Sequence, residues 1–148
     1  MGNTVNATPF ALRRAAQFDA VATTTLANIT GLTFDLVAGK TYYFRFKCNT
    51  SLAAAGGEKF AIGGTATATN INYSIISITT AAAIPIASQQ TALGGSAANG
   101  GYTASMVEIE GCIVVNAAGT LTVQFAQSAA SGTSSVLANS SFEVWEAV

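Results

Sequence analysis

The chain has 148 residues, a formal net charge of −1, and charged residues at only 9% of its positions, against about 25% in an ordinary soluble domain. This length suits one domain with its own core, and the near-neutral charge gives no general attraction to nucleic acid or to an anionic membrane, so we expect neither as a partner. No window offers the roughly 20 continuous apolar residues of a spanning helix, and the N-terminus lacks the basic and apolar regions of a secretory signal.

The first segment, residues 1–16, has no strand periodicity and is expected to be a short N-terminal arm, followed by a single domain over residues 17–148. The arm contains Pro9 and the pair Arg13 and Arg14, a third of all basic residues. Arginine pairs bidentately with carboxylates, so we name Arg13 and Arg14 as candidate contacts with a larger partner. The alternative is a solvated tail whose arginines only keep the chain soluble.

The domain opens with strand-like segments at residues 26–29, 32–36 and 42–47. In the last of these, Tyr42, Phe44 and Phe46 alternate with Tyr43, Arg45 and Lys47. This period of two is typical of a strand with one buried and one exposed face. We expect one shared core, which contains Phe34, Tyr42, Phe44, Phe46, Leu121, Val123 and Phe125.

Further strands are expected at residues 59–63, 70–79, 104–115, 120–128 and 136–146, with Gly- and Ser-rich connections between them. Around eight strands and no amphipathic helix predict an all-β fold, a single jelly-roll β-sandwich. Within residues 70–79, Tyr73 and Ile75 share one parity and Ile76 and Ile78 the other. Either a β-bulge lies between Ile75 and Ile76, or both faces of this strand are covered, as an oligomer would produce.

The residue types in the sequence give little support for a catalytic site. The chain has no histidine, which removes the common general base and most transition-metal sites. Glu108 and Glu110 are close in sequence and share a strand face, but no Asp-rich loop accompanies them. We expect these carboxylates to be solvated or paired across strands with Arg45, Lys47 or Lys59. The chain is therefore expected to be no enzyme, with no cofactor and no metal.

Cys48 and Cys112 are the only cysteines, too few for a disulfide framework. Their parities place Cys48 with the buried side chains and Cys112 on the other face, unless Gly111 introduces a bulge. Two free thiols are the favoured interpretation, and a Cys48–Cys112 disulfide is the alternative.

Three aromatic residues are candidates for a subunit interface. Tyr43 and Trp145 have parities opposite to their buried neighbours, and large aromatics outside a core often mark an interface. Tyr73, in the strand expected at residues 70–79, is the third candidate. The alternative is that they shield a strand edge or lie beneath a loop. The low charge density favours assembly, because a monomer of this composition would expose association-prone edges.

Residues 32–46, with the sequence LTFDLVAGKTYYFRF, resemble the "agent of entry" strand pair of tailed-bacteriophage virion proteins. Downstream, FAIGG at 60–64, VEIEG at 107–111 and AGTLTVQFA at 118–126 keep the order of that family. Residues 136–145, VLANSSFEVW, are similar to the closing strands of trimeric C1q/TNF-like jelly rolls, with Asn139 where glycine is more usual. The resemblance covers residues 25–145 and implies a non-enzymatic phage structural protein that forms a homotrimer.

From this resemblance we expect a capsid decoration (cement) protein, which binds the major capsid protein on the outside of the virion and stabilises the head. It would be assembled in the host cytoplasm. The chain shows no long repeats or heptads of a fibre shaft, which favours the capsid over a fibre. The alternative is the receptor-binding tip of a head or tail fibre.

Overall fold

The structure, a computed structural model, describes residues 10–79 and 85–147. These residues form strands and connecting loops; no helix occurs among them, and so none that could cross a membrane. The strands are β1 (Phe10–Arg14), β2 (Phe18–Val21), β3 (Ala27–Leu36), β4 (Thr41–Ser51), β5 (Glu58–Gly63), β6 (Thr67–Thr79), β7 (Pro85–Gln90), β8 (Ser96–Asn99), β9 (Ala104–Ala117), β10 (Gly119–Ala126), β11 (Thr133–Val136) and β12 (Ser140–Glu146).

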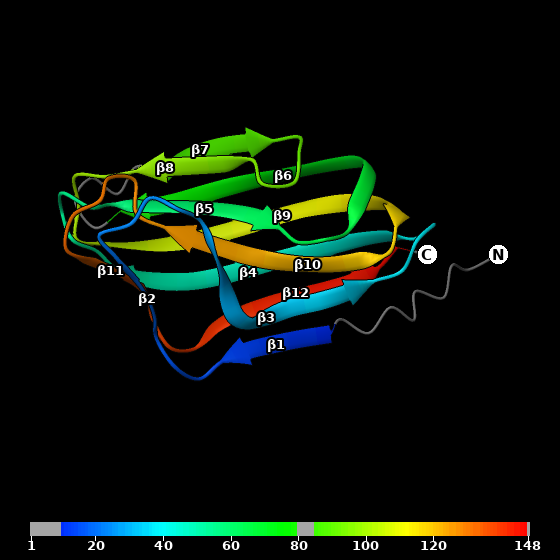
Figure 1. Cartoon of the computed structure of the whole chain (residues 1–148), viewed down its shortest axis with the longest axis horizontal. Coiled ribbons are helices and arrows are strands. Elements are labelled where there is room, and N and C mark those ends of the chain that lie inside the picture. The colour runs from blue at the N-terminus through cyan, green and yellow to red at the C-terminus, as the bar shows by residue number, and fades with distance from the viewer. Residues whose placement is uncertain (1–9, 80–84, 148) are drawn as a thin grey trace.

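The strands form two antiparallel sheets that face each other (Figure 1). The larger sheet has the order β1-β12-β4-β9-β6-β7, and the smaller one the order β3-β10-β5-β8. Eight strands pair as a nested series: β1 with β12, β3 with β10, β4 with β9, and β5 with β8. An antiparallel ribbon of this kind, rolled into two layers, is a jelly roll. The predicted all-β jelly-roll β-sandwich is confirmed.

Four strands lie outside this series. β6 and β7 form a hairpin that extends the larger sheet beyond β9, and the short strands β2 and β11 pair with each other beside one end of β4. The hairpin gives the larger sheet a wide outer face that the smaller sheet does not cover.

The predicted boundary of the N-terminal arm is wrong. Phe10–Arg14 is strand β1, which pairs with β12 in register from Phe10 opposite Val144 to Arg14 opposite Ser140. Five residues are too few to show a period, and their pairing partner lies at the other end of the chain. The rest of the predicted arm before Phe10 lies outside the described residues.

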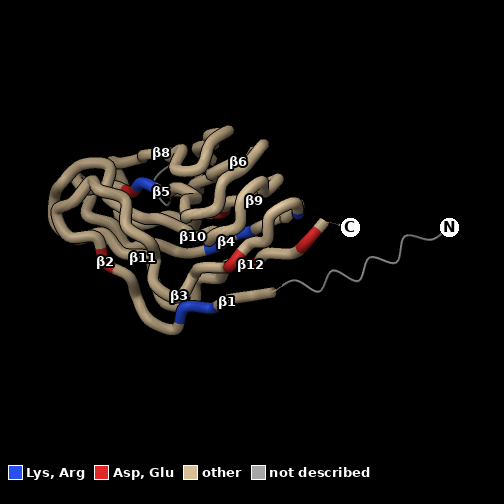
Figure 2. Tube along the Cα trace, turned by 45° about the vertical axis from the view of Figure 1, so that its right-hand side comes forward, with Lys and Arg blue, Asp and Glu red and all other residues tan. Residues whose placement is uncertain are grey.

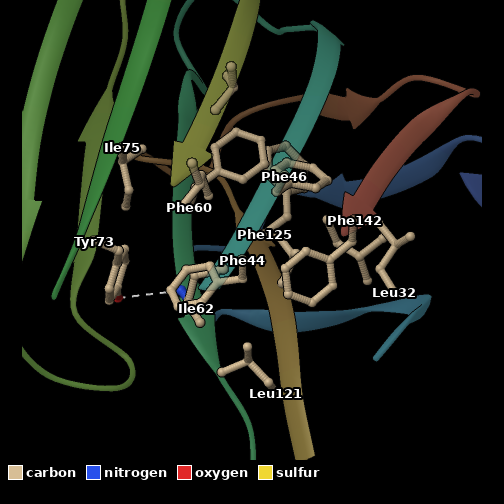
Figure 3. Close-up of a cluster of buried hydrophobic side chains, with 14 of the residues drawn as sticks. Leu32, Phe44, Phe46, Phe60, Ile62, Tyr73, Ile75, Leu121, Phe125 and Phe142 are labelled. Atoms are coloured by element: carbon tan, nitrogen blue, oxygen red, sulfur yellow. Dashed lines mark hydrogen bonds between the residues drawn. The ribbon is translucent and has the colours of Figure 1, made fainter. Parts of the chain in front are cut away.

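The core lies between the sheets and is rich in aromatic rings (Figure 3). The rings of Phe60 and Phe125 are 4.9 Å apart between centroids, and Phe46 packs 6.0 Å from Phe60. Five of the seven predicted core residues are fully buried: Phe44, Phe46, Leu121, Val123 and Phe125. Phe34 and Tyr42 are only partly buried, because both line a hollow at the surface, although both pack against the core.

Of the two alternatives for residues 70–79, the bulge between Ile75 and Ile76 is absent. The register with β9 runs without interruption from Ile75 opposite Ile109 to Ile76 opposite Glu108, and the shifts in β6 occur earlier, near Ala68. The buried parity continues through Ser77, so Ile76 and Ile78 point to the outer face of the sheet. Gly111 introduces no bulge either, since β4 and β9 stay in register across it.

Candidate assembly surface

The outer face of the larger sheet carries a group of aromatic and apolar side chains at one end. The register places Trp145 opposite Tyr43, and Tyr43 opposite Cys112, so that three neighbouring strands present these residues side by side. The rings of Tyr43 and Trp145 lie 6.1 Å apart, and 45% of Tyr43 is exposed. Together with Val114, which is also exposed, these residues form what we call the aromatic patch: Tyr43, Cys112, Val114 and Trp145.

A shallow hollow adjoins this patch and extends to Asn72 on β6. The Arg45 guanidinium lies 5.9 Å from the centre of the Trp145 ring and pairs with Glu110, Nε to Oε1, at 2.8 Å. The positive charge therefore has both an aromatic and a carboxylate partner. The hollow is thus lined by the aromatic rings of Tyr43 and Trp145 and by the Arg45–Glu110 ion pair.

Cross-strand ion pairs occupy the middle of the face. Besides Arg45–Glu110, Lys47 Nζ lies 3.3 Å from Glu108 Oε2. The predicted cross-strand pairing of Glu108 and Glu110 is confirmed, with Arg45 and Lys47 rather than Lys59 as partners. Such exposed pairs contribute roughly 0.2–1 kcal/mol each.

The opposite corner of the same face is mainly apolar, and the charged Glu108 on β9 borders it opposite Ile76. Ile78 lies opposite both Met106 on β9 and Pro85 on β7, and Ile76 lies opposite Ala87. Met106 is 48% exposed and Ile78 37% exposed. We call this group, Ile76, Ile78, Pro85, Ala87 and Met106, the isoleucine patch. Between Lys59 and Glu108 no residue is charged, and in Figure 2 the whole of β6 is free of charged positions.

The candidate interface residue Tyr73 is not on this surface. Tyr73 is 3% exposed, its ring centre lies 6.0 Å from that of Phe44 in a tilted arrangement, and its hydroxyl donates a hydrogen bond to the carbonyl of Gly95. Its place between the sheets follows from its parity with Ile75, and the interface prediction for Tyr73 is wrong. Tyr43 is exposed and Trp145 half-buried, both outside the core as predicted.

The two candidate arginines have different surroundings. Arg14 donates to the carbonyls of Thr30 and Gln17, and its guanidinium lies 5.5 Å from the Phe18 ring centre. It therefore ties β1 to neighbouring parts of the chain. Arg13 is exposed and donates from Nε to Oδ1 of Asn139 at 2.9 Å. Arg13 is thus the more accessible of the two cations.

Both cysteines are free thiols, as predicted, and Cys112 lies on the outer face. Burial raises the pKa of the Cys48 thiol well above its ordinary value, and the nearby Glu58 carboxylate raises it further. Burial also raises the pKa of Cys112. Both shifts favour the unreactive thiol over the thiolate.

A buried carboxylate that the sequence interpretation missed lies between the sheets. Glu58 is fully buried, and its oxygens accept hydrogen bonds from Ser105 Oγ at 2.6 Å, Tyr102 Oη at 3.2 Å and Thr50 Oγ1 at 3.3 Å. Burial, followed by the Glu58 charge, raises the pKa of Tyr102, so this tyrosine remains a hydroxyl donor. The sequence contained a signal for its burial: Glu58 lies two residues before the buried Phe60, so both side chains point to the same face of the strand.

This cluster joins three strands and one loop but has the composition of a structural site. Its donors are hydroxyl groups, and none of the ion pairs between described residues involves Glu58. Among residues 10–79 and 85–147 no three His, Cys, Asp or Glu side chains come together where they could hold a metal ion. The cluster connects β5 to β4 and β9 across the core, which fixes the spacing of the sheets.

No family model matches the sequence, and no curated protein matches it significantly. Among solved structures, the chain is similar to the VP2 subviral particle of infectious bursal disease virus, with a TM-score of 0.29 and 10% identity over 100% of this chain and 43% of that one. The Gx strain of the same virus gives a TM-score of 0.24 and 11% identity over 95% and 40%. The chain spans about two fifths of the length of these structures. Such low scores support no conclusion about function, and the fold assignment rests on the strand pairing alone.

Proposed function

We propose that this chain is a non-enzymatic structural subunit of a bacteriophage particle, which forms a homotrimer and decorates the outside of the capsid. The observation that carries the proposal is the outer face of the larger sheet. It presents Tyr43, Trp145 and a second apolar patch on a chain with very few charges. Exposed or half-buried tyrosine and tryptophan side chains of this kind are enriched at protein–protein contacts.

The physical argument for self-association is that the two apolar patches of this face are poorly suited to water. Tyrosine and tryptophan contribute large apolar areas and lose little side-chain entropy on burial. A second copy of the same chain is always present at equal concentration and offers the same apolar patches. Closed cyclic symmetry would cover these patches without leaving an open contact that forms filaments.

The virion part of the proposal is supported by the sequence resemblance of residues 32–46 and 136–145 to phage structural proteins and trimeric jelly rolls. In this proposal the major capsid protein is the partner, and Arg13 contacts a carboxylate on the shell. Arg13 suits this role better than Arg14, whose guanidinium is engaged within the chain.

Two measurements test the proposal. Light scattering should report three times the chain mass, 14.9 kDa, at micromolar concentration. Imaging of labelled particles of the phage that encodes this chain should show the protein on the outside of the head. A monomeric mass, or a label confined to the tail, would contradict it.

A variant at Arg13 tests the shell contact separately. Arg13→Ala should lower the number of copies on each particle and leave the trimer intact, and Lys40→Ala, which removes an exposed cation elsewhere, is the matched control. Deletion through Arg14 is a poor test, because it would remove β1 from the sheet.

A receptor-binding fibre tip is the second candidate. The hollow beside Tyr43 and Trp145 favours it, since its ring faces, amide and ion pair could hold a sugar or a peptide. The two candidates differ in whether Tyr43 and Trp145 stay open to solvent in the assembled particle. Protection of Tyr43 from surface labelling in the oligomer would favour assembly, and full labelling would favour the receptor-binding tip.

A further inference from the structure

The inference concerns a covalent change at the end of β8, and it depends neither on the oligomeric state nor on the virion role of the proposed function. Asn99 is followed by Gly100, and no other asparagine in the chain precedes a glycine. In such a pair the glycine nitrogen reaches the asparagine side chain with least hindrance, because glycine has no Cβ and its backbone is free to turn.

We propose that Asn99 is a site of spontaneous deamidation in the folded protein. The Gly100 nitrogen gives its proton to hydroxide and attacks Cγ of Asn99. The new C–N bond closes a five-membered succinimide ring, and Nδ2 takes up a proton from solvent and leaves as ammonia. Water then adds to one of the two ring carbonyls and opens the ring, which gives aspartate or isoaspartate at position 99.

The structure leaves the two reacting groups free to meet. β8 ends at Asn99, and Gly100 is exposed in the loop that follows. The Gly100 N–H has no hydrogen-bond acceptor among residues 10–79 and 85–147. Asn99 Nδ2 lies 3.5 Å from Ser77 Oγ, at the outer limit of a hydrogen bond. Rotation of the Asn99 side chain toward Gly100 therefore breaks no strong hydrogen bond.

The other asparagines of the described chain lack this combination. Five of them lie inside strands, where the ladder fixes the backbone: Asn28, Asn49, Asn70, Asn72 and Asn116. Asn139 lies in a turn, but its Oδ1 accepts a hydrogen bond from Arg13. The residue after it, Ser140, has a side chain and begins β12. We therefore expect Asn99 to react first.

The new carboxylate would lie beside the buried Glu58. Asn99 is directly opposite Glu58 in the pairing of β5 with β8, so both side chains point to the same face of the smaller sheet. Ser77, the contact of Asn99 on the facing sheet, is fully buried, which places the Asn99 side chain between the sheets. Glu58 has hydroxyl donors, and none of the ion pairs between described residues involves it, so no cation there would offset a second negative charge.

Deamidation should therefore loosen β8. This strand has four residues and, among the described strands, pairs with β5 alone. Like charges directly opposite each other destabilise a strand pair, and isoaspartate also adds a carbon to the main chain, which shifts the ladder. The expected result is release of this edge of the smaller sheet as the protein ages.

Incubation of the intact, folded protein in mildly alkaline water labelled with heavy oxygen tests the site. Peptide mapping by mass spectrometry should find the label at position 99, in aspartate and isoaspartate, before it appears at any other described asparagine. Gly100→Ala is the matched variant. Its Cβ would have Ser128 Oγ as nearest neighbour, at 3.2 Å, and the backbone there is not left-handed, so the variant should fold, as circular dichroism checks.

Gly100→Ala should deamidate about tenfold more slowly than the wild type, a barrier difference of about 1.4 kcal/mol. An unlabelled Asn99 at the end of the incubation, or equal rates in the two proteins, would overturn the site.

A second pair of variants tests the loosening of β8. Asn99→Asp carries the charge of the product, and Asn99→Ala removes the amide without adding a charge. Hydrogen exchange of the backbone amides of residues 96–99 should be about fivefold faster in Asn99→Asp than in Asn99→Ala. Equal exchange in these two variants would overturn the effect on β8.

Discussion

Replacement of Phe125 by alanine tests whether the strand parity that defines the core is correct. The Phe125 ring is fully buried, with its centre 4.9 Å from that of Phe60 and 6.5 Å from that of Phe18. Removal of a buried phenylalanine ring costs about 3–5 kcal/mol, a large part of the roughly 5–15 kcal/mol that holds a domain folded. For a domain of this size, each kcal/mol lost from the free energy of unfolding lowers the melting temperature by about 2–4 °C, so we expect the melting temperature of Phe125→Ala to fall by about 6–20 °C.

The assay is thermal unfolding followed by circular dichroism, at one fixed protein concentration because oligomers melt at concentration-dependent temperatures. Phe10→Ala is the matched control: the same ring is removed from β1, where Phe10 is 74% exposed. The control should melt within a few degrees of the wild type. If Phe125→Ala melted like Phe10→Ala, the assignment of this strand's inward face would be refuted.

Three further predictions concern other parts of the protein. Glu58→Ala should destabilise the protein by about 3 kcal/mol, because it leaves buried hydroxyls without their acceptor, and Glu58→Gln, which keeps an acceptor oxygen, should cost less in a urea titration. Gly111→Ala should cost roughly 1–3 kcal/mol in the same titration, since a Cβ there would lie 2.4 Å from Cβ of Tyr73. Ellman's reagent should leave Cys48 of the folded protein unmodified and react slowly with Cys112, because burial raises both pKa values; rapid modification of both would contradict the described burial.

The alternation of residues along single strands was sufficient to predict the fold class and much of the site. Phe44 and Phe46 are buried while Arg45 and Lys47 lie outside, because neighbouring residues of a strand point to opposite faces. The same rule placed Tyr43, Cys112 and Trp145 on the outer face of the larger sheet. It also contained the information that Tyr73 is buried and Glu58 faces the core, although the first was named as an interface residue and the second was overlooked.

Only the tertiary structure decided how distant segments meet. Strand β1 depends on residues 140–144, and β7 and β8 are short, polar segments stabilised by pairing with β6 and β5. No local period marks such strands, because their hydrogen-bond partners lie in other parts of the chain. Likewise, parity alone says that Ile78 and Tyr43 point outward, but it cannot say which strands lie between them. The order of strands in the sheet sets how far apart the two patches lie. That order depends on pairing between residues far apart in sequence, so a single strand does not reveal it.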